Sequence, residues 1–171
     1  MWTKLPVILA ALALSAPPVA ALAEAPVAGL SPEERRQIAA IPEEYVERAL
    51  AGDWQGVADL YHPEAIQVLP DTPPAEGRDA IRDALAGLLG TEGGVRLTDF
   101  SVDLHETEVL GGAIFVQATY RFEVELLGRA EGSLEQHGPY ANLLRPDADG
   151  TWRIWRQFVG RAHPPLGPAA E

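Results

Sequence analysis

Four histidines, His62, His105, His137 and His163, are the side chains best suited to move protons or bind metals near neutral pH. A zinc-binding helix needs two histidines one turn apart, as in H-x-x-x-H or H-E-x-x-H. Neither spacing occurs here, and the sequence has no cysteine to supply thiolate ligands. We therefore expect no metal site and no cofactor, and we expect His62, which precedes Pro63, to cap a loop.

Other motifs for covalent chemistry are also missing. The chain has no glycine-rich phosphate loop and no Gly-x-Ser-x-Gly elbow, and the lack of cysteine rules out thiol catalysis. The formal net charge of −12 argues against binding to nucleic acid and against docking to an anionic membrane. Three classes of function remain open: small-molecule binding, catalysis by ordinary polar side chains, and assembly.

The first helix to position such side chains should begin after Ser31. Ser31 and Glu34 have the spacing of a capping box, and Pro32 suits the first helical position. Proline inside a helix removes a hydrogen bond, so Pro42 should kink or restart it. One apolar stripe recurs at helical spacing: Ile38, Ile41, Tyr45 and Ala49.

Two further helices and a short strand follow. Gly52 and Asp53 should end the first helix and cap a second, whose apolar face carries Trp54, Val57 and Leu60. Residues 65–69 are typical of a strand, and residues 78–89 of a helix. The inward face of that helix should carry Ile81, Leu85, Leu88 and Leu89.

The second half of the chain predicts four long strands, over residues 95–109, 113–127, 132–145 and 151–159. Helices followed by an antiparallel meander indicate an α+β fold, with a curved sheet wrapped over a helical layer. Alternation along one strand should direct an apolar face inward: Ile114, Val116, Ala118, Tyr120 and Phe122. Trp155 and Gln157 should share a face, either closing a pocket or buried in a dimer.

The termini predict processing and export. Residues 1–23 have the features of a secretory signal peptide, with Lys4 before an apolar run and an Ala21-Leu22-Ala23 cleavage pattern. We expect export to the periplasm or the medium of a bacterium, and no membrane contact after cleavage. Residues 24–32 should form a flexible leader and residues 161–171 a disordered tail.

Three segments together resemble a known superfamily. They are residues 45–54 (YVERALAGDW), 60–65 (LYHPEA) and 77–81 (GRDAI), followed near the end by Gly138-Pro139-Tyr140 and residues 149–154 (DGTWRI). Their order resembles ketosteroid-isomerase-like and SnoaL-like, polyketide-cyclase-like domains of the nuclear transport factor 2-like superfamily. The resemblance covers about residues 33–160. It implies a cone-shaped domain in which a curved, mainly antiparallel sheet wraps around three N-terminal helices.

The resemblance also implies a site. Tyr45 matches the oxyanion-hole tyrosine of ketosteroid isomerases, and Asn142 falls where a second donor lies. The catalytic aspartate of that family falls on Leu69, which cannot move a proton, so a base would have to come from elsewhere. The candidates are Asp71, His105, Glu123 and His137. The expected ligand-binding residues are Tyr61, Leu69, Ile114, Val116, Ala118, Tyr120, Trp155 and Gln157.

Three functions stay open. The first is binding of a small apolar molecule in the cone, with Tyr45 and Asn142 fixing one polar group. The second is an isomerase or cyclase that uses these two donors with a relocated base. The third is a homodimeric assembly domain that pairs through the polar face of the sheet.

Overall fold

The protein is described by a computed structural model that covers residues 29–128 and 132–162. Three helices precede four long strands, as the sequence predicts. The helices are α1 (Pro32–Leu50), α2 (Trp54–Asp59) and α3 (Arg78–Leu89), followed by a 3₁₀ turn, η2 (Thr91–Gly93). The strands are β1 (Tyr61–Val68), β2 (Ala75–Glu76), β3 (Val95–Leu110), β4 (Ala113–Leu126), β5 (Ser133–Pro146) and β6 (Trp152–Val159).

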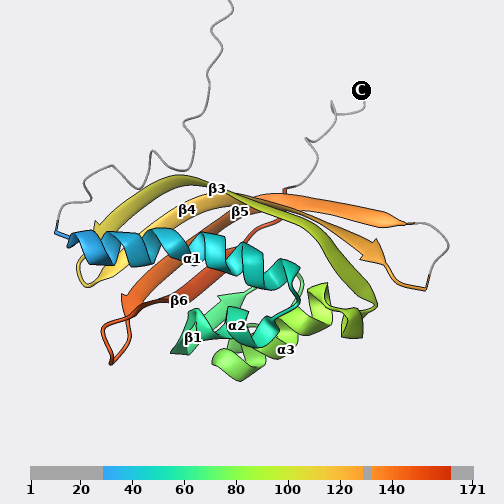
Figure 1. The fold of residues 1–171 in the computed structure, drawn as a ribbon, viewed down its shortest axis with the longest axis horizontal. Coiled ribbons are helices and arrows are strands. Elements are labelled where there is room, and N and C mark those ends of the chain that lie inside the picture. The colour runs from blue at the N-terminus through green and yellow to red at the C-terminus, as the bar shows by residue number, and fades with distance from the viewer. Residues whose placement is uncertain (1–28, 129–131, 163–171) are drawn as a thin grey trace, which may run out of the picture.

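The six strands form one mixed sheet in the order β2-β1-β6-β5-β4-β3. Neighbours are antiparallel except β1 and β6, which run parallel. The long strands curve, and α1 lies across their concave side, with α2 and α3 below it (Figure 1). This arrangement confirms the predicted α+β cone.

Local sequence explains how α1 begins and ends. The Ser31 side chain accepts from the Glu34 N–H and the Glu34 carboxylate accepts from the Ser31 N–H, which is the predicted capping box. Asp53 caps α2 by accepting from the Gly56 N–H at 2.8 Å. Of the two outcomes expected at Pro42, a kink or a restart, the restart is wrong, because α1 continues through this residue. Packing of the helix on the sheet outweighs the one lost hydrogen bond.

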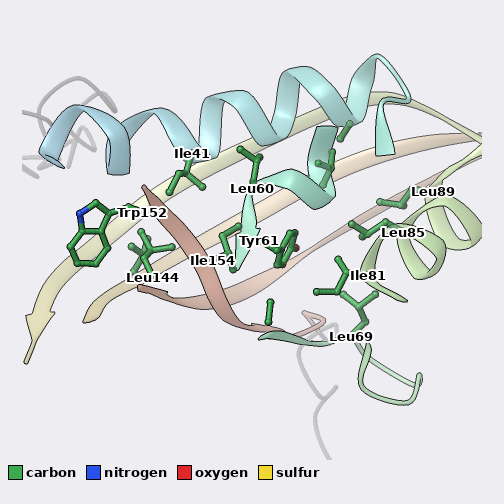
Figure 2. Close-up of a cluster of buried hydrophobic side chains, with 14 of the residues drawn as sticks. Ile41, Leu60, Tyr61, Leu69, Ile81, Leu85, Leu89, Leu144, Trp152 and Ile154 are labelled. Carbon is green, nitrogen blue, oxygen red and sulfur yellow. The ribbon is translucent and has the colours of Figure 1, made fainter. Parts of the chain in front are cut away.

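The core lies between the helices and the concave face of the sheet. Figure 2 shows Ile41, Leu85 and Ile154 among the buried side chains that α1, α3 and β6 contribute to the same cluster as Tyr61. Residues of the predicted stripe of α1 are buried or pack against this core. Leu88 differs from the expectation, because it is 48% exposed rather than inward. It lies one position before Leu89, at the margin of the apolar face of α3.

The first strand begins four residues earlier than expected, at Tyr61 instead of Ala65. Its start is set by pairing with a distant segment, since Tyr61 lies opposite Ile154 and the Ile154 N–H donates to the Leu60 carbonyl at 2.9 Å. His62 is therefore within a strand, and its Nδ1 accepts from the Glu64 N–H. The residues around Pro63 do not indicate that β1 pairs with β6, so they could not locate the start of the strand.

The predicted signal peptide, residues 1–23, lies outside the described residues, as do most of the leader and residues 163–171. Arg161 and Ala162, which the sequence predicts to be part of the tail, lie against the sheet: the Ala162 N–H donates to the His137 carbonyl at 2.9 Å. Within the described part of the chain, no helix is long and apolar enough to cross a membrane.

Candidate functional site

A cavity of about 110 Å³ lies between α1, α3 and the concave face of the sheet. Apolar side chains make up most of its wall. The lining residues are Ile41, Pro42, Tyr45, Leu69, Pro70, Leu85, Leu88, Leu89, Phe100, Val102, Tyr120, Phe122, Gln136, Tyr140, Asn142, Ile154, Gln157, Val159 and Arg161. A concave, mostly apolar site with a few convergent polar groups is the usual form of a small-molecule site.

Tyr45 reaches the cavity from α1. Its ring packs edge-on against Tyr61, with 6.4 Å between ring centroids, and against Phe100 at 5.9 Å. Burial raises the pKa of Tyr45 to about 12. Its hydroxyl therefore stays protonated at neutral pH and is available as a hydrogen-bond donor.

Behind Tyr45, three side chains form a buried polar cluster. The Tyr61 hydroxyl donates to Gln157 Oε1 at 2.7 Å, and Gln67 Nε2 donates to both Tyr61 at 2.9 Å and Gln157 at 2.7 Å. The Tyr45 and Tyr61 hydroxyl oxygens are 3.5 Å apart. Desolvation raises the pKa of Tyr61 well above its usual value, so this cluster is uncharged. Its hydrogen bonds fix Gln157 at the cavity wall.

Asn142 lies beside this cluster on β5, directly opposite Gln157 on β6 and Val116 on β4. It is only 6% exposed and lines the cavity. Its Oδ1 is buried and has no hydrogen-bond partner among the described residues. Buried polar groups are nearly always paired, because an unpaired one costs about 1–3 kcal/mol. An unpaired amide at a cavity wall therefore points to a missing binding partner.

The structure brings together five of the predicted site residues: Tyr45, Leu69, Tyr120, Asn142 and Gln157 all line the cavity. Leu69 follows β1 directly and presents an apolar side chain where the resemblance implies an aspartate.

Five predicted ligand-binding residues lie outside the lining: Tyr61, Ile114, Val116, Ala118 and Trp155. Tyr61 is fully buried, and its hydroxyl donates to Gln157 Oε1, which does line the cavity. Ile114, Val116 and Ala118 are also buried, so the predicted inward face of β4 is confirmed. These three belong to the packed core, and the cavity meets only the part of β4 that carries Tyr120 and Phe122.

Trp155 does not share a face with Gln157, which corrects the sequence expectation. The β5–β6 ladder pairs Leu143 with Arg156 and Leu144 with Ile154, so Trp155 is an extra residue in β6. Such a bulge shifts the alternation, and both Ile154 and Gln157 then face the cavity. Trp155 instead packs beneath the guanidinium of Arg156, 3.9 Å from its ring centroid.

Sequence reasoning missed Tyr140, although it precedes Asn142 by two residues and so shares its face of β5. Desolvation raises the pKa of Tyr140 above its usual value. Alternation along β5 was the signal that could have identified it. Phe100 and Val102 on β3 were also missed, because no motif marks that strand.

Arg161 is the one charged side chain in the lining. It follows β6 and forms an ion pair with Asp71 at 2.9 Å, in which both side chains are substantially exposed. Exposed pairs of this kind contribute little to stability. Arg161 thus marks the outer end of the cavity, beside the exposed Leu88.

None of the four candidate bases is part of the lining. Asp71 pairs with Arg161 outside it, and His105 contacts Thr119 on an exposed part of the sheet, with Nε2 and Oγ1 3.1 Å apart. Glu123 alternates with the inward-facing Phe122, and His137 is exposed. The described residues also contain no group of three or more side chains placed to hold a metal ion.

Fold and site together define a cone-shaped α+β domain with a mostly apolar cavity, whose lining includes a single charged side chain, Arg161. Residues 43–161 match the SnoaL-like domain family, and the chain belongs to that family. None of the curated proteins matches the sequence.

Solved structures share the fold at low sequence identity. A ketosteroid isomerase-like protein from Erwinia carotovora atroseptica superposes with a TM-score of 0.65 and 20% identity, covering 77% of this chain and 98% of that chain. ActVI-ORFA from Streptomyces coelicolor gives 0.62 and 14%, covering 75% and 96%. A Nostoc punctiforme domain of unknown function with a cystatin-like fold gives 0.62 and 16%, covering 80% and 82%. These similarities confirm the predicted fold.

Proposed function

We propose that the mature domain binds a small, mostly apolar molecule in this cavity, with Tyr45 and Asn142 fixing one polar group. The composition of the cavity wall carries the proposal. Apolar side chains surround a few uncharged hydrogen-bonding groups, and neither a carboxylate nor an imidazole lines it in the described part of the chain. Burial of apolar surface supplies the affinity, and the polar groups supply orientation.

The residues that line the cavity suit ligand binding without turnover better than they suit proton transfer. A general base must lie within hydrogen-bond reach of the proton that it removes. Leu69 falls where the resemblance to ketosteroid isomerases implies an aspartate, and the tyrosines at the cavity have raised pKa values. An enzymatic role would need a base that enters from outside this lining.

Native mass spectrometry of the protein purified from its exported fraction tests the proposal. We expect a small molecule to remain bound to the wild type and to be weakened in Tyr45→Phe, which keeps the ring and removes the hydroxyl.

A matched pair of variants on β3 separates the cavity from the rest of the surface. Val102 lines the cavity, whereas Asp103 is exposed. Val102→Trp should fill the space and abolish binding, and Asp103→Trp should leave it intact. Equal loss in both variants would count against a site in the cavity.

We also propose that the domain forms a homodimer through the outer face of the sheet. Phe158 on β6 is 50% exposed and lies opposite Ala141 of β5, and an ion pair on the same sheet joins Arg121 of β4 to Glu135 of β5 at 2.8 Å. A surface with both apolar and charged groups is typical of such interfaces. Sedimentation of wild type and Phe158→Ser should show a dimer that the substitution weakens. A monomer at high concentration in both would reject this proposal.

A further inference from the structure

The polar groups at the cavity include an acceptor that needs a donor. Asn142 Oδ1 is buried without a partner in the described structure. If the carboxamide were turned over, its amide nitrogen would occupy that place instead, so in either orientation one polar atom lacks a partner. The oxyanion-hole expectation asks only for donors, and the Asn142 carboxamide offers an acceptor as well.

Donors are present on the same wall. The single Tyr61 proton is directed to Gln157 Oε1 at 2.7 Å, which leaves the Tyr45 hydroxyl proton free to point into the cavity. Because the pKa of Tyr45 is raised to about 12, this proton is retained at neutral pH. An occupant can thus accept from Tyr45 while it donates to Asn142. A hydroxyl group does both, whereas a ketone or an ether can only accept.

The volume of the cavity and the charges in its lining further restrict which molecules can bind in it. An apolar cavity of about 150 Å³ holds benzene, and this one has a volume of about 110 Å³. This volume therefore matches one small ring. Arg161, the one charge in the lining, already pairs with Asp71. The rest of the wall offers no charge to compensate a buried anion or cation.

We propose that the cavity selects a small, neutral, single-ring alcohol, whose hydroxyl donates to Asn142 Oδ1 and accepts from Tyr45, and whose ring lies among the apolar side chains. This inference rests on the proposed binding function. It adds the size of the occupant, its lack of charge and its need to donate a hydrogen bond.

Four probes that share a cyclopentane ring test the requirements for a hydroxyl group and for a neutral ligand. They are cyclopentanol, cyclopentanone, methylcyclopentane and cyclopentanecarboxylate. Their dissociation constants would be measured by NMR titration of the mature protein at pH 7, following the Asn142 side-chain amide signals. We expect cyclopentanol to bind about ten-fold more tightly than the ketone or the hydrocarbon, as one buried hydrogen bond predicts.

Asn142→Leu, followed through backbone amide signals, should remove this preference while the hydrocarbon still binds. Gln117→Leu is the matched control, because it replaces an exposed amide on the neighbouring strand β4 and should leave the preference unchanged.

The possible outcomes are distinct. Equal affinity for the alcohol and the ketone, or a preference that survives in Asn142→Leu, would overturn the inference and leave the binding function standing. Tightest binding of the carboxylate would overturn the neutral character of the site. If none of the four probes binds, including the hydrocarbon, both the inference and the proposed binding function fail.

Discussion

Asn142 lowers the stability of the empty protein, and it lies at the cavity wall. Folding removes its carboxamide from water, and the described structure gives Oδ1 no hydrogen bond in return. Gln67, two strands away, is buried more deeply, and its Oε1 is also unpaired among the described residues, but its Nε2 donates two hydrogen bonds. The two amides therefore differ in role: Gln67 holds the wall together, and Asn142 is available to a ligand.

Replacing Asn142 with leucine should therefore stabilise the empty protein. We expect the free energy of unfolding in urea to rise by about 1 kcal/mol, because an apolar side chain of similar shape removes the desolvation cost. Gln67→Leu, the matched control, should lower it by about the same amount. If Asn142→Leu is instead the more destabilising variant, the Asn142 amide has a structural partner and is not free for a ligand.

The buried tyrosines predict how stability depends on pH. Folding raises the pKa of Tyr45 from 10.0 to about 12, mainly because its hydroxyl is desolvated. Below pH 10 the hydroxyl is protonated in both states and its contribution to stability is fully present. As the pH rises from 10 towards 12, the unfolded state loses this proton first, so stability falls.

Tyr45→Phe should make that fall less steep, by up to about 1.4 kcal/mol per pH unit. Urea unfolding of both proteins between pH 9 and pH 11.5 measures the difference, and the absorbance of phenolate at high pH shows which residues titrate. Parallel curves for the two proteins would mean that the Tyr45 hydroxyl is accessible to water in the folded state.

At the scale of elements, β5 and the segment after β6 close the outer end of the cavity together. The Gly160 N–H donates to the Pro139 carbonyl at 2.8 Å, and the Tyr120 hydroxyl donates to the Gly160 carbonyl at 2.9 Å. These bonds place Arg161 at the cavity. They require close approach at Gly138, where a Cβ atom would lie 3.0 Å from both Arg161 Cα and Ala162 N.

Gly138→Ala should therefore displace this segment and widen the cavity. Overpacking against backbone atoms costs about 1–3 kcal/mol of stability, and loss of the Arg161 position should raise the dissociation rate of a bound ligand. Gly112→Ala is the matched control, because a Cβ there meets nothing within 4 Å. Thermal unfolding and ligand dissociation would be compared in both variants. If they behave alike, the segment does not close the cavity.

For the whole molecule, the cleavage pattern at Ala21-Leu22-Ala23 predicts a mature chain that begins at Glu24. The full sequence expressed in a bacterium should yield an exported protein whose intact mass corresponds to residues 24–171. Ala23→Arg should block cleavage, because signal peptidase needs a small residue there, and unprocessed precursor should accumulate. A cytoplasmic protein of full mass in both cases would contradict the predicted export.

The sequence by itself determined the elements and the family. Capping residues, the stripe of α1 and the alternation of β4 are local patterns, and each predicted its element closely, because short-range periodicity decides which face is buried. Tyr45 and Asn142 were found because the resemblance placed them, and both lie at the cavity.

Only the tertiary structure decided which face of a strand each side chain occupies and which distant side chains it contacts. The early start of β1 comes from pairing with β6, and the bulge at Trp155 reverses an alternation that the sequence reads as regular. Tyr61, Gln67 and Gln157 meet through strands up to 96 residues apart. Hydrogen bonds of such long range depend on the register of the whole sheet, which no local pattern encodes.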